Sequence, residues 1–224
     1  EVIMTNTIQE QLQRIRPGEI QQFRNVSIYP LSLETANVVV HLVLKEALDN
    51  DLIVIREVDE GGHVPELVVA NYADQSILIL DGEELSGAKQ NRVLNTTVLL
   101  RRQTTTVIPV SCTEQGRWHY TTPVFKESGI MMSSRLRGLK HRSVREALST
   151  SGEYRSDQGA IWEGIHDQAR RAKVSLSTGA MRDIHTEKAA DIDAYMAHFP
   201  CVPGQQGLLV VVGGRIVGLD LVPY

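Results

Sequence analysis

Cysteine is scarce in this chain, and so are several other features that would point to a class of protein. Cys112 and Cys201 are the only cysteines, too few for a disulfide framework or for a zinc site built from thiolates. The longest aliphatic run, LLVVV at 208–212, has the length of a strand and is far too short to span a membrane. The basic segment 135–145 contains no aromatic residue that would stack on a base. We therefore expect no disulfide scaffold and no membrane protein, and nucleic-acid binding ranks low.

Sequence signatures of common catalytic and cofactor sites are also missing. There is no GxGxxG or GK[ST] phosphate loop, no HExxH zinc motif, and no GxSxG or kinase signature. The seven histidines show no paired spacing with carboxylates, so we expect no transition-metal site and identify no cofactor. Oxygen-ligated Mg²⁺ beside Glu83, Glu84 or Glu114 stays open.

What is present is the composition of a folded globular chain. Its 224 residues are 42% hydrophobic and 22% charged, which is enough to bury a substantial core. The formal net charge of -4 argues against a protein that coats nucleic acid. The first residues lack the apolar core of a signal peptide, and two reduced thiols are the plainer reading of the cysteines. We expect a cytoplasmic protein, and the sequence leaves its oligomeric state open.

Strand patterns occupy the first half of the chain and return at its end. Apolar residues predict strands at 19–33, 52–58, 64–71, 76–80, 93–100, 104–112, 117–120, 208–212 and 215–222. The glycine pair 213–214 predicts a tight hairpin between the last two strands. The run SILIL at 76–80 has so little polar alternation that we expect it to be a central strand.

Helical patterns are concentrated in the second half. Apolar spacing predicts helices at 42–49 and 159–173, with one or two more at 180–198. Ser143 followed by Glu146 predicts a helix start at a capping box. Residues 1–18 are predicted as an N-terminal helical segment that Pro17 and Gly18 stop.

The connections between predicted strands are too short for parallel crossovers. We therefore predict an α+β fold with a mainly antiparallel sheet, against which several helices pack, most of them from the C-terminal half. We predict one domain over 19–224.

A polar run, DGEELSGAKQNR, follows the buried strand SILIL directly. Its Glu83 and Glu84 are candidate catalytic acids or bases, and in an extended segment they point to opposite sides. Five further side chains offer donors to a phosphate, carboxylate or sugar: Lys89, Gln90, Asn91, Arg92 and Asn95. The alternative is structural, because the same charges can neutralise each other and fix the loop.

A second polar segment, SCTEQGRW, ends an apolar strand at 111–118. Cys112 is a candidate nucleophile and Glu114 a candidate acid or base, although a cysteine in this position is more often a buried apolar residue. Gln115, Arg117 and Trp118 are candidate ligand contacts, in which Arg117 would bind an anion and Trp118 would stack on a base or sugar. Arg117 and Trp118 can equally be a structural stacking pair.

These two segments carry a resemblance to a known family. DGEELSGAKQNRVLN and IPVSCTEQGRW resemble the ADP-ribosylglycohydrolase and rhodanese-phosphatase-superfamily-associated protein domain, and SSRLRGLK, QGAIW and GQQGLLVVVGGRIVGLDL resemble it more loosely. The resemblance implies a bacterial or archaeal cytoplasmic domain that works alongside nucleotide-derived or phosphorylated molecules. It brings no catalytic residues with it.

Our leading hypothesis is that the two polar segments meet at one end of the sheet and bind a nucleotide-derived or sugar-phosphate molecule, such as an ADP-ribose-type ligand. Whether the protein also hydrolyses or modifies that molecule stays open. The alternative is a non-catalytic interaction or scaffold domain whose polar motifs are structural.

Overall fold

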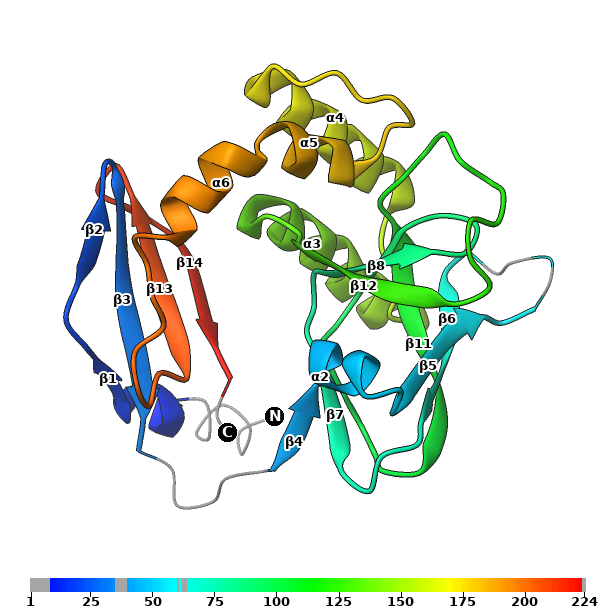
Figure 1. Cartoon of the computed structure of the whole chain (residues 1–224), viewed down its shortest axis with the longest axis horizontal. Helices are drawn as coiled ribbons and strands as arrows, with labels where there is room; N and C mark the ends of the chain where they lie inside the picture. The colour runs from blue at the N-terminus through cyan, green and yellow to red at the C-terminus, as the bar shows by residue number, and fades with distance from the viewer. Residues whose placement is uncertain (1–8, 35–39, 60, 62–63, 223–224) are drawn as a thin grey trace. The chain divides into compact units, whose positions relative to one another are not determined.

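The computed structural model describes residues 9–34, 40–59, 61 and 64–222 (Figure 1). The chain forms two compact units, which we call terminal and central. The terminal unit joins Glu1–Val40 to Ala189–Tyr224, and the central unit is His41–Lys188. The predicted single domain over 19–224 stays a prediction. The predicted helix at the N-terminus lies partly outside the described residues, and within them 9–13 are helical.

The terminal unit is an antiparallel sheet with strand order β1-β3-β13-β14, and β2 pairs with β3. Its elements are β1 (Ile15–Pro17), β2 (Gln21–Phe23), β3 (Val26–Leu33), α6 (Ala189–Met196), β13 (Gly207–Val212) and β14 (Arg215–Leu221). Gly213 and Gly214 both have positive φ, 55° and 77°, as the predicted hairpin between β13 and β14 requires. That hairpin prediction is confirmed.

The central unit is built around two sheets. The larger sheet is antiparallel throughout and has the order β12-β8-β9-β11-β6-β5; the smaller has the order β10-β7-β4, in which β4 and β7 are parallel. The strands are β4 (His41–Val43), β5 (Ile53–Glu57), β6 (Glu66–Asn71), β7 (Ser76–Ile79), β8 (Glu83–Gly87), β9 (Arg92–Leu94), β10 (Val98–Leu100), β11 (Thr104–Cys112) and β12 (Phe125–Met131). The run SILIL forms β7, the central strand of the smaller sheet, as predicted.

Two apolar cores hold this unit together. Ile55, Ile79 and Leu85 belong to a core that both sheets enclose together with α2 (Leu44–Asp49). Val93 and Ile161 belong to a second core, which joins β9 to three helices. These helices are α3 (Ser134–Ser151), α4 (Gln158–Ala172) and α5 (Met181–Glu187). The predicted α+β fold, with mainly antiparallel strands and helices concentrated in the C-terminal half, is confirmed.

The prediction of one strand at 93–100 is wrong, because polar side chains divide it. β9 and β10 belong to different sheets. Between them the Asn95 amide donates to the Val110 carbonyl, and the Thr97 hydroxyl accepts a hydrogen bond from the Asp81 backbone. These side-chain bonds replace the strand ladder and turn the chain.

The predicted helix start at Ser143 is also wrong. α3 begins at Ser134, and the Ser133 side chain accepts the capping hydrogen bond from the Leu136 N–H. The Ser143 hydroxyl lies inside the helix, where it donates to the Lys140 carbonyl at 2.9 Å. A serine followed by a glutamate three residues later also occurs in helix interiors, so the pattern alone does not identify a terminus.

The segment before α3 differs from the prediction in two places. Residues 117–120 form no strand. β12 was not predicted, because its pairing with β8 shifts register between Glu127 and Met131, where Gly129 has a φ of 73°. A bulge of this kind breaks the two-residue alternation by which a strand is recognised.

Candidate functional site

The two polar segments meet at one end of the interior strands β8, β9 and β11 of the larger sheet. β9 pairs with β8 on one side and with β11 on the other. The turn between β8 and β9 therefore lies against the residues that follow β11, and the Thr113 N–H donates to the Asn91 carbonyl at 3.0 Å. The structure therefore shows the predicted adjacency of the two polar segments.

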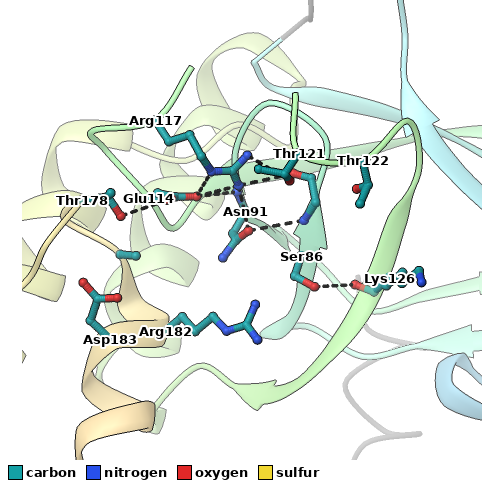
Figure 2. Close-up of a pocket in the computed structure, with 12 residues that line it drawn as sticks. Ser86, Asn91, Glu114, Arg117, Thr121, Thr122, Lys126, Thr178, Arg182 and Asp183 are labelled. Atoms are coloured by element: carbon teal, nitrogen blue, oxygen red, sulfur yellow. Dashed lines mark hydrogen bonds and ion pairs between the residues drawn. The ribbon is translucent and has the colours of Figure 1, made fainter. Parts of the chain in front are cut away.

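Arg117 ties the two segments together. Its guanidinium lies 2.7 Å from the Glu114 carboxylate, and it donates to the Ala88 carbonyl at 2.7 Å and to the Asn91 side-chain oxygen at 3.0 Å (Figure 2). Arg117 and Glu114 are both buried. Because their charges neutralise each other and the guanidinium is bonded on every side, this pair fixes the loop conformation.

Glu114 is bonded on its other side as well. The Thr178 hydroxyl donates to the second Glu114 oxygen at 2.9 Å, so the residues before α5 are joined to the same cluster. The Asn91 side-chain oxygen is occupied by Arg117 and by the Gly87 N–H. Its amide nitrogen donates to no described residue.

A cavity of about 340 Å³ opens beside this cluster. Asn91 is 5% exposed, and its amide nitrogen points into the cavity, as does the guanidinium of Arg182 from α5 (Figure 2). The lining residues, which we call the Arg182 pocket, are Ser86, Gly87, Asn91, Glu114, Arg117, Thr121, Thr122, Lys126, Thr178, Ala180, Arg182 and Asp183. The surface is therefore rich in hydroxyl, amide and cationic groups.

Arg182 forms no ion pair with any described residue, and the same holds for Lys126. Glu114 is neutralised by Arg117, and Asp183 accepts hydrogen bonds from the Ser177 N–H and hydroxyl at 2.7 and 2.9 Å. Three positive side chains (Arg117, Lys126 and Arg182) and two negative ones (Glu114 and Asp183) line the pocket, so its net charge is +1, which favours an anion.

Glu84 lies next to this region on β8, two residues before Ser86 and on the same strand face. It is 1% exposed and accepts a hydrogen bond from the Thr113 hydroxyl at 2.7 Å, and its second oxygen has no hydrogen-bond partner among the described residues. Burial raises the pKa of Glu84 to about 7, while the hydrogen bond from Thr113 and, to a smaller extent, the positive charge of Arg182 act in the opposite direction. A pKa of about 7 is the property expected of an acid or base near neutral pH, but Glu84 itself does not line the Arg182 pocket.

Glu83 points to the opposite face of β8, as predicted for consecutive residues of a strand. One of its oxygens accepts a hydrogen bond from the Leu80 N–H at 2.6 Å. Burial also raises the pKa of Glu83 to about 7. Glu83 does not line the Arg182 pocket.

Cys112 and Arg92 lie in a separate buried cluster. Arg92 is fully buried and donates to the Cys112 sulfur and to the Gln90 side-chain oxygen, both at 3.0 Å. Glu57, which sequence analysis did not single out, lies 3.6 Å from the guanidinium. Burial raises the pKa of Cys112 to about 11, which disfavours the thiolate that a nucleophile needs.

The remaining predicted contacts lie outside the Arg182 pocket. Asn95 donates to the Tyr154 carbonyl at 2.8 Å and has a structural position. The Lys89 ammonium lies 5.4 Å from the centroid of the Trp118 ring. The Gln115 side-chain oxygen lies 3.1 Å from a ring nitrogen of His166.

A buried polar cluster elsewhere in the unit was missed. The Lys140 ammonium, which is fully buried, bonds to the Asp81 carboxylate and to the Leu94 carbonyl, and His141 bonds to the other Asp81 oxygen. Burial lowers the pKa of Lys140. Lys140 belongs to the basic segment 135–145, and its burial distinguishes it from exposed neighbours on α3 such as Arg142 and Arg145.

Arg182, Thr178 and Ser86 are pocket residues that sequence analysis did not identify. Arg182 follows Asn91 by 91 positions, and no spacing pattern links residues so far apart. Among the described residues, no group of three histidine, cysteine, aspartate or glutamate side chains lies close enough together to hold a metal ion. A Mg²⁺ site beside Glu83, Glu84 or Glu114 stays an untested prediction. No described helix has both the length and the apolar character needed to cross a membrane.

Comparison with known proteins places the chain in a family. No curated protein and no solved structure matches it. Residues 14–224 match one family model, and they include both polar segments, the whole central unit and most of the terminal unit. The chain therefore belongs to the family of the ARG and Rhodanese-Phosphatase-superfamily-associated Protein domain, as its sequence motifs predicted.

Proposed function

We propose that this protein binds a small phosphorylated sugar-type molecule in the Arg182 pocket. The observation that carries the proposal is the Arg182 guanidinium, which lines a cavity of hydroxyl and amide groups and has no ion-pair partner among the described residues. A guanidinium of this kind binds phosphate in a two-pronged geometry. Lys126 supplies a second cation to the same lining.

The rest of the lining suits the sugar part of such a ligand. Ser86 and Thr178 carry hydroxyl groups, and the Asn91 amide nitrogen is an unused donor. A cavity of about 340 Å³ lies at the lower end of the size range of small-molecule sites. The family description names an association with ARG and rhodanese-phosphatase superfamilies, which agrees with a ligand derived from ADP-ribose or another phosphorylated compound in the cytoplasm.

Glu84 is the residue through which binding would extend to catalysis. Its buried carboxyl group lies on the strand face that carries Ser86, and its pKa of about 7 suits proton transfer. Turnover of a bound phosphorylated sugar would then be lost in Glu84→Gln, while binding would be retained.

Isothermal titration with ribose 5-phosphate tests the binding proposal. We expect saturable binding that weakens at least about tenfold in Arg182→Ala, since a charged hydrogen bond is lost. Arg145→Ala is the matched control, because Arg145 is also exposed on a helix but does not line the pocket. Absence of binding by the wild-type protein, or equal binding by Arg182→Ala, would overturn the proposal.

A second candidate function is that of a non-catalytic scaffold. The observation that favours it is the buried cluster of Arg117, Glu114 and Asn91, whose bonds are largely internal. A scaffold would bind none of the phosphorylated compounds, and its polar variants would change only the stability of the fold. The Arg182→Ala protein separates the two candidates, because Arg182 takes no part in that cluster.

A further inference from the structure

Asn71, Asn91 and Asn95 are buried in the central unit, and Asn91 differs from the other two. Asn71 and Asn95 each donate through the amide nitrogen to two main-chain carbonyls, at distances between 2.8 and 3.3 Å. The Asn91 nitrogen donates to no described residue, although the side chain is only 5% exposed. A buried amide donor is almost always paired, so the unused hydrogens of Asn91 point to a ligand in the Arg182 pocket.

The orientation of the Asn91 amide is fixed by its neighbours. Its oxygen accepts hydrogen bonds from the Arg117 guanidinium at 3.0 Å and from the Gly87 N–H at 3.4 Å (Figure 2). A guanidinium and a backbone N–H are donors only, so neither could accept from the amide nitrogen if the side chain were turned over. Asn91 therefore presents only hydrogen-bond donors to the pocket.

The polarity of Thr178 is fixed in the opposite sense by the other member of the ion pair. Its hydroxyl donates to Glu114 at 2.9 Å, and a carboxylate paired with a guanidinium only accepts (Figure 2). The hydroxyl hydrogen is thus committed, while the oxygen accepts from no described residue. Thr178 therefore presents only an acceptor to the pocket that it lines.

Main-chain hydrogen bonds hold the Thr178 segment in place. The Gly116 N–H donates to the Thr178 carbonyl at 2.6 Å, and the Met181 N–H donates to the Thr113 carbonyl at 2.8 Å. A Cβ atom on Gly116 would come within 2.9 Å of the Thr178 carbonyl oxygen, so glycine permits this close approach. Because these bonds do not involve the hydroxyl, Thr178→Val should leave the segment where it is.

A fixed donor and a fixed acceptor in one cavity match the hydroxyl groups of a ligand. A hydroxyl has one hydrogen to donate and two lone pairs with which to accept, whereas the ionised oxygens of sulfate or of a phosphate ester only accept. We propose that Asn91 and Thr178 determine the specificity of the Arg182 pocket for phosphorylated polyols, Asn91 by donating to ligand hydroxyls and Thr178 by accepting from them. Arg117 and Glu114 are positioning residues, since they fix the direction of both hydrogen bonds.

This inference rests on the proposed function and names the groups that would recognise the sugar. Isothermal titration of the intact chain with ribose 5-phosphate and with methyl phosphate, a phosphate ester without hydroxyl groups, tests it. Two hydrogen bonds to hydroxyls should make ribose 5-phosphate bind about five- to a hundredfold more tightly.

Thr178→Val should separate recognition of the sugar from recognition of the phosphate. We expect it to weaken ribose 5-phosphate about two- to tenfold and to leave the affinity for methyl phosphate unchanged, because only the former has a hydroxyl to donate. Thr178→Ser should retain the affinity for both. Thr150→Val is the matched control, since the Thr150 hydroxyl also donates within the protein, to the Glu146 carbonyl at 2.9 Å, but does not line the pocket.

Nuclear magnetic resonance of the side-chain amides tests Asn91 in the unaltered protein. Saturation with ribose 5-phosphate should shift the Asn91 amide signals. The signals of Asn71 and Asn95 should stay in place, because their hydrogens are already donated to carbonyls. Asn91 signals that do not move in the ligand-bound protein would overturn the role of this residue.

The outcomes separate the two proposals. Equal affinities for ribose 5-phosphate and methyl phosphate, or equal weakening of both by Thr178→Val, would overturn this inference while the Arg182 pocket stands. Absence of binding by both compounds would overturn both proposals. If Thr178→Val does not fold, the comparison of the two compounds and the Asn91 signals of the wild-type protein still decide.

Discussion

Two arginines, Arg117 and Arg182, line the Arg182 pocket, and the protein holds them in opposite ways. Arg117 is buried and bonded to a carboxylate, a carbonyl and an amide oxygen. Arg182 is exposed and forms no ion pair with the described residues. The guanidinium of Arg117 is hydrogen-bonded within the fold, whereas that of Arg182 is the group to which our proposal assigns the ligand. A polar residue near a cavity is thus a candidate contact only if the protein leaves its donors unused.

The largest effect is expected on stability, when the buried Arg117 is replaced. Arg117→Met leaves the Glu114 carboxylate buried without its partner, so we expect the free energy of unfolding to fall by about 3–5 kcal/mol. Urea unfolding measures this loss. The double variant Arg117→Met/Glu114→Gln should lose less than the sum of the single variants, because the unpaired charge is gone. A loss below about 1 kcal/mol in Arg117→Met would show that the pair is not structural.

The next effect concerns Glu84 and the pH dependence of folding. Because burial raises its pKa from 4.5 to about 7, ionisation of Glu84 opposes folding. This residue's contribution to stability is therefore fully present below about pH 4.5 and is lost as the pH rises through 7. The loss is on the order of 3 kcal/mol. Relative to Glu84→Gln, the wild-type protein should become less stable over this interval, as urea unfolding at several pH values would show; a constant difference would contradict the prediction.

Ionisation of Glu84 should also weaken the binding of anions in the Arg182 pocket. Sulfate keeps its charge between pH 6 and 8, so a change in its binding reports on the protein alone. We expect sulfate to bind the Arg182 pocket about three- to tenfold more weakly at pH 8 than at pH 6, because ionised Glu84 adds a negative charge nearby. Glu83 has a similar pKa, and Glu83→Gln should keep the pH dependence that Glu84→Gln removes.

The smallest effect is expected on stability when Arg182 is replaced. Arg182 is exposed and unpaired among the described residues, so Arg182→Ala should change the free energy of unfolding by less than about 0.5 kcal/mol. Thermal unfolding without ligand measures this change. A larger loss would place Arg182 with Arg117 among the residues that hold the fold.

The fold could largely be predicted because its main signals are local. Aliphatic runs, the glycine pair 213–214 and the apolar spacing of 159–173 depend on neighbours within a few residues. The errors came where a side chain bonds outside its own segment: Asn95 divides a strand, and Ser143 mimics a helix cap inside α3. A bulge at Gly129 concealed β12.

The sequence by itself determined that the polar segments around Glu84 and Arg117 follow buried strands, and that the chain belongs to its family. Tertiary structure alone decided which of these polar groups face one another and which face a cavity. Arg117 and Arg182 carry the same charged group, and no local pattern separates them. The difference lies in desolvation: a guanidinium enclosed by the fold must be fully paired, whereas one at a cavity surface can remain unpaired because water or a ligand satisfies it.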